Sequence, residues 1–136
     1  ERLLAELSDL DALFHEGLQA CEQNDIVVSH EAFMYLGRAY GISVTSIAGI
    51  SPDEEPSPKE LARIADLVRA KGVKYVFFET TASPKLSETL AREIGGEVLV
   101  LNPLESLTPD ELGRGEDYVS IMVSNLKNLR KALICQ

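Results

Sequence analysis

Positive charge, long apolar runs and tryptophan are scarce or absent in this sequence. Lysine and arginine number 13 against 22 acidic residues, which gives a net charge of −9, and the bases are not clustered. This argues against nucleic acid as a partner, because nucleic-acid surfaces need clustered bases. No apolar run approaches the ~20 residues that span a bilayer. The hydrophobic content of 45% is nevertheless sufficient for the core of one domain.

An initiator methionine and a signal-peptide pattern are also absent. The chain begins with Glu1 inside a pattern typical of a helix, so we expect further sequence to precede it. The two cysteines, Cys21 and Cys135, are too far apart for a C-x-x-C metal site. They are predicted either to form a disulfide or to behave as two small hydrophobic residues, and the sequence does not decide between these.

Two common catalytic signatures are missing as well. The sequence has no G-x-x-x-x-G-K-[ST] segment, which argues against a phosphate-binding loop. It has no G-x-S-x-G segment and only two histidines, which gives little support to a serine hydrolase.

What the sequence does contain is a regular alternation of helix and strand patterns. Helical spacing is found at 1–22, at 31–40, from Ser57 to Gly72, from Ser83 to Gly95, and from about Asp117 onwards. Short apolar strands are predicted at 25–30, 42–49, 73–79 and 97–102. The alternation predicts an α/β fold with a four-stranded parallel sheet and helices on both faces.

Polar residues follow each predicted strand, at the edge where parallel sheets bind ligands. They are His30 after the first strand, the acids of 53–55 after the second, Glu79 after the third, and Asn102 with Glu105 after the fourth. Imidazole nitrogen and carboxylate oxygen are ligands for divalent metal ions. The residues therefore indicate an α/β domain with a candidate cation site.

Each of these side chains also has an ordinary structural interpretation. His30 is interpreted as a helix cap or a partner of a buried carbonyl group, and Glu79 as an acceptor for loop amides. Glu105 and the acids of 53–55 are interpreted as solvated loop residues. The residues alone leave these alternatives open.

Several ordered motifs resemble those of the zinc/manganese solute-binding proteins of ABC importers, the cluster A-I family. The segment from Ser29 to Leu36 is similar to the family's S-H-x-A-F-x-Y-L signature. Further similar segments follow in the same order: Gly49-Ile50-Ser51, Glu55-Pro56-Ser57, Tyr75 to Glu79, Ser83-Pro84-Lys85-Leu86, Asn102-Pro103-Leu104-Glu105, and the helix from Tyr118 to Leu133. The resemblance covers nearly the whole chain from about residue 25.

This resemblance implies two α/β lobes joined by one long rigid helix. Residues 1–22 would be the end of that helix, and residues 23–136 would be the carboxy-terminal metal-binding lobe, with the amino-terminal lobe absent. In the family the first lobe supplies two histidines. The second lobe supplies the histidine that matches His30 and an acid that matches Glu105. Three histidines and one carboxylate favour zinc over manganese, which prefers more oxygen donors.

The function implied is capture of zinc, with manganese as the alternative, and its delivery to an ABC permease. The expected location is the periplasm or the outer face of the cytoplasmic membrane, with a lipid anchor in some members. No enzymatic activity is expected. The alternatives are a small zinc-dependent hydrolase that uses His30, Glu79 and Glu105, or a siderophore-type binding lobe. We also expect the isolated lobe to bind zinc poorly, because two protein ligands do not close a four-donor site.

Overall fold

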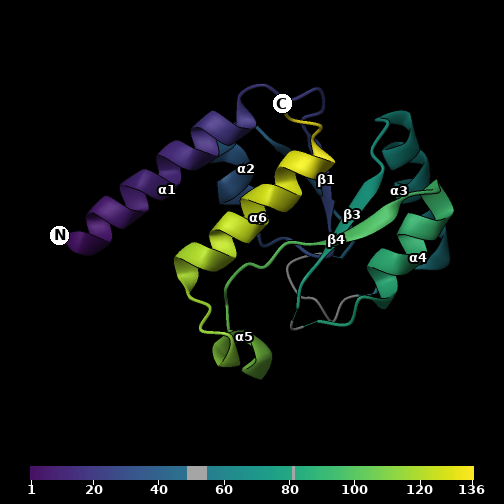
Figure 1. The fold of residues 1–136 in the computed structure, drawn as a ribbon. Helices are drawn as coiled ribbons and strands as arrows, with labels where there is room; N and C mark the ends of the chain where they lie inside the picture. The colour runs from purple at the N-terminus through teal and green to yellow at the C-terminus, as the bar shows by residue number, and fades with distance from the viewer. Residues whose placement is uncertain (49–54, 81) are drawn as a thin grey trace.

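The structure, a computed structural model, describes residues 1–48, 55–80 and 82–136 (Figure 1). The strands are β1 (Asp25–Val28), β2 (Ser43–Ser46), β3 (Tyr75–Phe78) and β4 (Glu97–Val100). The helices are α1 (Arg2–Leu18), α2 (Met34–Tyr40), α3 (Pro58–Ala70), α4 (Lys85–Ile94), α5 (Pro109–Gly113) and α6 (Tyr118–Ala132).

The four strands form one parallel sheet in the order β2-β1-β3-β4. Helices α1, α2 and α6 lie over one face, and α3 and α4 lie over the other (Figure 1). The predicted α/β fold with a four-stranded parallel sheet and helices on both faces is therefore confirmed. Because β1 and β3 occupy the centre, residues that follow these two strands emerge side by side.

Alternating side chains of the central strands build two apolar layers. Ile26, Val28 and Phe77 join the layer under α1 and α6, whereas Val27 and Val76 join the layer under α3 and α4. All five are essentially inaccessible to solvent. A strand buried on both faces reads as a continuous apolar run, which is why these segments were recognisable from the sequence.

The strands and the second helix are shorter than the sequence patterns predicted. The strands expected at 25–30 and 73–79 end at Val28 and Phe78. The helix expected from residue 31 begins at Met34, because the chain first makes a turn in which the Ala32 N–H donates to the His30 carbonyl oxygen. His30 and Glu79 therefore lie just beyond the strands rather than within them.

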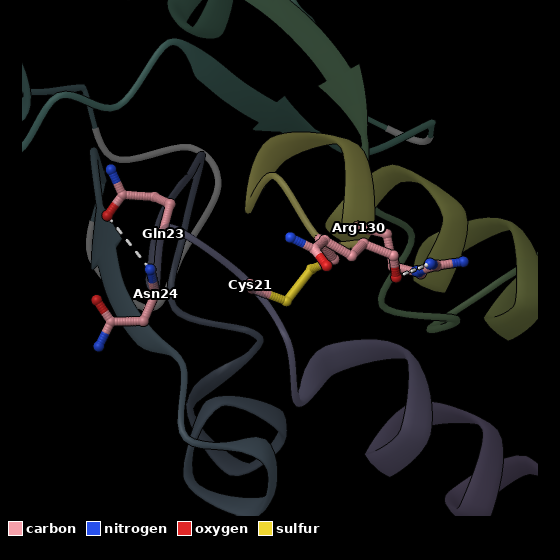
Figure 2. The surroundings of a disulfide bond; sticks show 6 residues. Cys21, Gln23, Asn24 and Arg130 are labelled. Atoms are coloured by element: carbon pink, nitrogen blue, oxygen red, sulfur yellow. Dashed lines mark hydrogen bonds between the residues drawn. A yellow bond between two sulfur atoms is a disulfide. The ribbon is translucent and has the colours of Figure 1, made fainter.

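A disulfide between Cys21 and Cys135 decides the alternative that the sequence left open. It joins the segment after α1 to the segment after α6, across 114 residues of sequence (Figure 2). Two backbone hydrogen bonds from Glu22 and Gln23 to the 133–134 segment lie beside it. The carboxyl ends of α1 and α6 are thus tied together, whereas the amino end of α1 extends away from the rest of the molecule (Figure 1).

None of the helices in the described residues combines the length and apolar character needed to cross a bilayer.

Candidate metal centre

The register of the sheet brings His30 and Glu79 together. Val28 of β1 is paired with Phe77 of β3. His30 and Glu79 each come two residues after this pair, so they leave adjacent strands at the same level. Both side chains are buried, with about 3% of their surface exposed. Two polar groups that fold into such a site need a partner, and here each is the partner of the other.

The contact joins His30 Nδ1 to Glu79 Oε1. Neither atom has a hydrogen bond among the described residues, so this close contact is the one polar interaction recorded there for either atom. Burial raises the pKa of the Glu79 carboxyl above its usual value; attraction to His30 opposes the rise, and the Glu105 carboxylate adds to it. A carboxylate at Nδ1 favours the imidazole tautomer that carries its proton there, which leaves the Nε2 lone pair free to bind a metal ion.

Glu105 lies on the other side of the imidazole. Its Oε1 is 4.0 Å from His30 Nε2, and its side chain is 67% exposed. Two ligands of one tetrahedral zinc ion, at ordinary bond lengths, are about 3.4 Å apart. A small rotation of the exposed Glu105 side chain closes that difference, so these two atoms fit one divalent ion.

The sequence-derived candidates divide into two groups in the structure. His30, Glu79 and Glu105 converge, as expected from the ends of their strands. Glu79 contacts the imidazole through Oε1, and its interpretation as an acceptor for loop amides stays a prediction. Asp53 and Glu54 lie outside the described residues. Glu55 instead lines a cavity of about 470 Å³ together with Ser46 and Arg63, and none of the three converging side chains is among its lining residues.

The arrangement is a candidate for part of a metal site. Across residues 1–48, 55–80 and 82–136, no group of three or more histidine, cysteine or acidic side chains is placed to hold an ion together. The candidate ligand atoms are Nε2 of His30 and a carboxylate oxygen of Glu105, and Glu79 contacts the other ring nitrogen of His30.

Two polar side chains near the Glu105 loop were not among the residues predicted from the sequence. Asn125 and Glu111 are buried and contact Asn102 at the end of β4. A signal was present: Asn125 is a polar residue on the apolar stripe of the last helix, where only a bonded amide is tolerated. Glu111 also completes the capping box of α5 with Thr108.

Comparison with known proteins identifies the family. The family model described as ZnuA, zinc-uptake complex component A, periplasmic, matches residues 1–132. The zinc-binding lipoprotein AdcA of Streptococcus pneumoniae is 42% identical over 128 residues, covering 94% of this chain and 26% of that protein. The high-affinity zinc uptake system protein ZnuA of Bacillus subtilis is 40% identical over 131 residues, covering 96% of this chain and 41% of that protein.

Solved structures agree with the sequence relatives. The Zn(II)-bound ZnuA-like domain of Streptococcus pneumoniae AdcA superposes with a TM-score of 0.80 at 41% identity, covering 97% of this chain and 49% of that one. The laminin-binding protein Lbp of Streptococcus pyogenes superposes with a TM-score of 0.84 at 32% identity, covering 95% of this chain and 49% of that one. This chain thus spans less than half of each of these relatives. It belongs to the ZnuA family, described as zinc-uptake complex component A, periplasmic.

Proposed function

We propose that this chain is the carboxy-terminal half of an extracytoplasmic protein that captures zinc and delivers it to an ABC permease. One observation carries the proposal: His30 Nε2 lies 4.0 Å from a Glu105 carboxylate oxygen, while Glu79 contacts the opposite ring nitrogen. This is the arrangement in which a histidine is oriented for metal binding by a carboxylate behind it. The zinc-binding and zinc-uptake names of the relatives support the same function.

His30 and Glu105 are the proposed ligands of the transported ion. A closed zinc site takes four donors, so two more come from elsewhere. We assign them to an amino-terminal lobe of the same protein, with the ion held between the lobes. Zinc is favoured over manganese because one of the two proposed ligands is the imidazole of His30, which suits zinc better than the harder manganese ion.

The proposed division of the chain follows from this arrangement. Residues 1–22 are the end of a helix that links the lobes, and residues 23–136 are the carboxy-terminal metal-binding lobe. The amino end of α1 supports this division, because it extends from the body and leaves Leu3 and Leu4 more than 60% exposed. Apolar side chains of that size gain free energy when a second lobe covers them.

The proposed location is the periplasm or the outer face of the cytoplasmic membrane, with a lipid anchor where the protein is a lipoprotein. Two findings support it. The family description and the pneumococcal relative's name carry the words periplasmic and lipoprotein. The disulfide between Cys21 and Cys135 belongs to the kind of bond that persists in oxidising compartments outside the cytoplasm.

Capture and delivery make and break no covalent bond in the cargo, so the proposal assigns no catalytic residue. A zinc hydrolase built on the same three side chains would need a base that reaches a metal-bound water. Glu79 is the buried candidate for that role, but its Oε1 contacts His30 Nδ1, on the side of the ring opposite the Glu105 contact. The geometry therefore favours binding over hydrolysis.

The test is zinc titration calorimetry on the full-length protein, with His30→Ala and Glu105→Ala compared with wild type. Both substitutions are expected to lower zinc affinity, His30→Ala by at least about 100-fold, because a direct ligand matters at least as much as its outer partners. His15→Ala is the matched histidine control, since His15 is an exposed residue of α1. Glu88→Ala, an exposed acid in α4, is the matched carboxylate control.

Three outcomes would contradict the proposal. Unchanged zinc affinity in both His30→Ala and Glu105→Ala would remove the metal site from this edge of the sheet. Tight stoichiometric zinc binding by residues 1–136 alone would show that the site needs no second lobe. A zinc-dependent hydrolysis that disappears in Glu79→Gln would favour the enzyme instead.

A further inference from the structure

Three polar side chains are buried around the end of β4, and none of them is a proposed ligand of the ion. Asn102, Glu111 and Asn125 each expose less than 5% of their surface. Asn102 lies two residues after β4, Glu111 lies in α5, and Asn125 lies in α6. Buried polar groups are stable only when they are hydrogen-bonded. Their bonds therefore show what the cluster holds in place.

Asn125 ties the backbone of Asn102 to α6. The Asn102 N–H donates to Asn125 Oδ1 at 2.9 Å, and Asn125 Nδ2 donates to the Asn102 carbonyl oxygen at 2.8 Å. The side-chain amide thus satisfies both backbone groups of one residue, as a neighbouring strand would. This fixes the point from which the loop to Glu105 begins.

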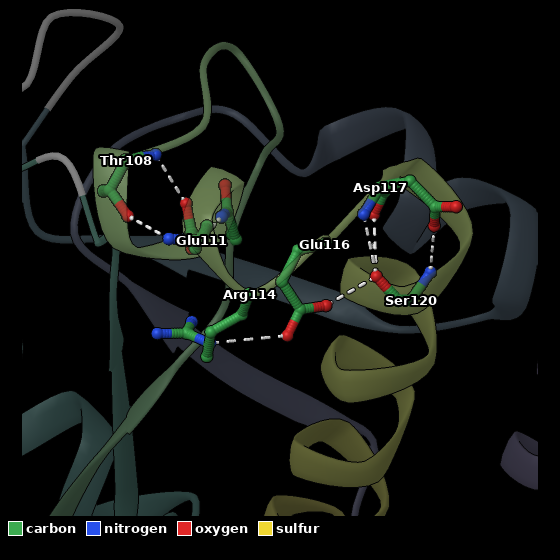
Figure 3. A network of polar contacts seen from close by, with 7 residues as sticks. Thr108, Glu111, Arg114, Glu116, Asp117 and Ser120 are labelled. Atoms are coloured by element: carbon green, nitrogen blue, oxygen red, sulfur yellow. Dashed lines mark hydrogen bonds and ion pairs between the residues drawn. The ribbon is translucent and has the colours of Figure 1, made fainter.

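The side chain of Asn102 then reaches both sides of that loop. Its Oδ1 accepts from the Leu104 N–H at 2.8 Å, and its Nδ2 donates to Glu111 Oε1 at 3.1 Å. The other oxygen of Glu111 accepts from the Thr108 N–H at 2.7 Å, in the capping box of α5 (Figure 3). Asn102 and Glu111 therefore hold the segment 103–107 at its start and at its end.

Leu104 has an uncommon backbone conformation, and one of the hydrogen bonds of Asn102 supports it. Its φ of 63° lies in the left-handed region, which residues other than glycine, asparagine and aspartate seldom adopt. The bond from its N–H to Asn102 Oδ1 stabilises that conformation. Glu105 is the next residue, and the direction of its side chain towards His30 depends on the backbone of Leu104.

We propose that Asn102, Glu111 and Asn125 are positioning residues that hold Glu105 at the distance from His30 required for a shared metal ion. This inference rests on the proposed function, because it gives the network a role in zinc affinity rather than in stability alone. The rival interpretation is that the three side chains merely complete a helix cap and a strand end.

Asn128 provides a matched control for Asn125. Both lie on α6, and Asn128 Nδ2 donates to the Val100 carbonyl oxygen at 2.8 Å, two residues before Asn102. Each side chain ties α6 to the β4 segment, but only Asn125 bonds the residue that begins the loop. Asn125→Ala is expected to weaken zinc binding by the full-length protein about 10-fold, as loss of a supporting side chain does. Asn128→Ala is expected to change it less than about 2-fold by the same reasoning.

Leu104 provides a second test that leaves every buried polar group intact. In Leu104→Ile, β-branching makes the left-handed conformation still less favourable, so zinc affinity is expected to fall about 10-fold. In Leu104→Asn, the side chain tolerates that conformation, so zinc affinity is expected to stay near the wild-type value. This pair keeps the proposal testable even if Asn125→Ala does not fold.

The deciding measurement repeats both substitutions in a Glu105→Ala background. If the network acts through Glu105, neither Asn125→Ala nor Leu104→Ile lowers zinc affinity further, because the side chain they position is gone. Fully additive losses, or equal affinities for Asn125→Ala and Asn128→Ala, would overturn the proposal. If Glu105→Ala alone leaves the affinity unchanged, the ligand assignment fails first and the positioning role with it, so the two failures are distinguishable.

Discussion

The two ends of the sheet are held together by different kinds of interaction. At the amino ends of the strands, the Cys21–Cys135 disulfide joins the segments after α1 and α6, and Lys71 forms a 2.9 Å ion pair with Asp25. At the carboxyl ends, a buried imidazole, a buried carboxyl group and buried amides hold one another by polar contacts. The covalent end stabilises the fold, whereas the polar end orients candidate ligands. Substitutions at the two ends should therefore separate stability from zinc affinity.

Removal of the disulfide is expected to have the largest effect on stability. Replacing Cys21 and Cys135 by serine opens a loop of 114 residues, for which the chain-entropy relation gives a loss of about 4–5 kcal/mol in the free energy of unfolding. Zinc affinity of the protein that remains folded should stay within about 2-fold, because the bridge lies at the opposite end of the sheet. Urea denaturation and zinc titration of the same variant check both parts. A parallel loss of zinc affinity would break the separation between the ends.

Glu79→Gln is expected to show the opposite behaviour. The neutral amide has the same shape but holds the Nδ1 proton of His30 less strongly, so zinc affinity should fall about 10-fold. The free energy of unfolding should not decrease, because burial disfavours the charged form of Glu79, as its raised pKa indicates. Calorimetric zinc titration beside thermal unfolding of the metal-free protein measures the two effects. Glu93→Gln, an exposed acid of α4, is the control.

Gly96→Ala tests the amino end without touching the disulfide. A Cβ at Gly96 would overlap the carbonyl oxygen of Lys74, so the β3–β4 pair must shift. The expected loss is about 1–3 kcal/mol in the free energy of unfolding, with zinc affinity unchanged. Gly113→Ala is the matched control, because nothing lies within 4 Å of the added Cβ. Equal destabilisation by both substitutions would contradict the close-contact explanation.

The smallest expected effect is a pH dependence at the carboxyl end. Hydrogen bonds, first of all from the Thr108 N–H, hold the pKa of Glu111 below its usual 4.5. Because the folded-state pKa is depressed, the stabilisation by Glu111 is present above its unfolded pKa and is lost as pH falls through the folded value. Near neutral pH, the free energy of unfolding of the wild type should exceed that of Glu111→Gln by about 1 kcal/mol, which is the usual contribution of a helix cap. Urea denaturation from pH 7 to 3 should show this difference shrinking; a constant difference would contradict the assignment.

Sequence patterns predicted the fold and the position of His30 for the same reason. Apolar runs such as Tyr75–Phe78 are characteristic of strands buried on both faces, and a residue after a central parallel strand lies at the ligand-binding edge. The pairing of His30 with Glu79 required the register between Val28 and Phe77, which no local pattern specifies. The disulfide likewise depended on how α1 and α6 pack together.

The support of Glu105 was the least predictable feature. Its direction depends on the conformation of Leu104, and that conformation depends on Asn102 and Asn125, which are 23 residues apart in sequence. Contacts of this separation are set by tertiary packing rather than by local propensity. Only the polar residue on the apolar face of the last helix indicated that a buried partner existed.

The most direct test of the account is anomalous X-ray diffraction at the zinc absorption edge from crystals of the zinc-loaded full-length protein. The account predicts one zinc ion bonded to His30 Nε2 at about 2.0–2.1 Å and to a Glu105 carboxylate oxygen at about 2.0–2.2 Å. Glu79 should remain on the Nδ1 side of the imidazole, out of contact with the ion. A zinc ion bonded to neither His30 nor Glu105 would contradict it.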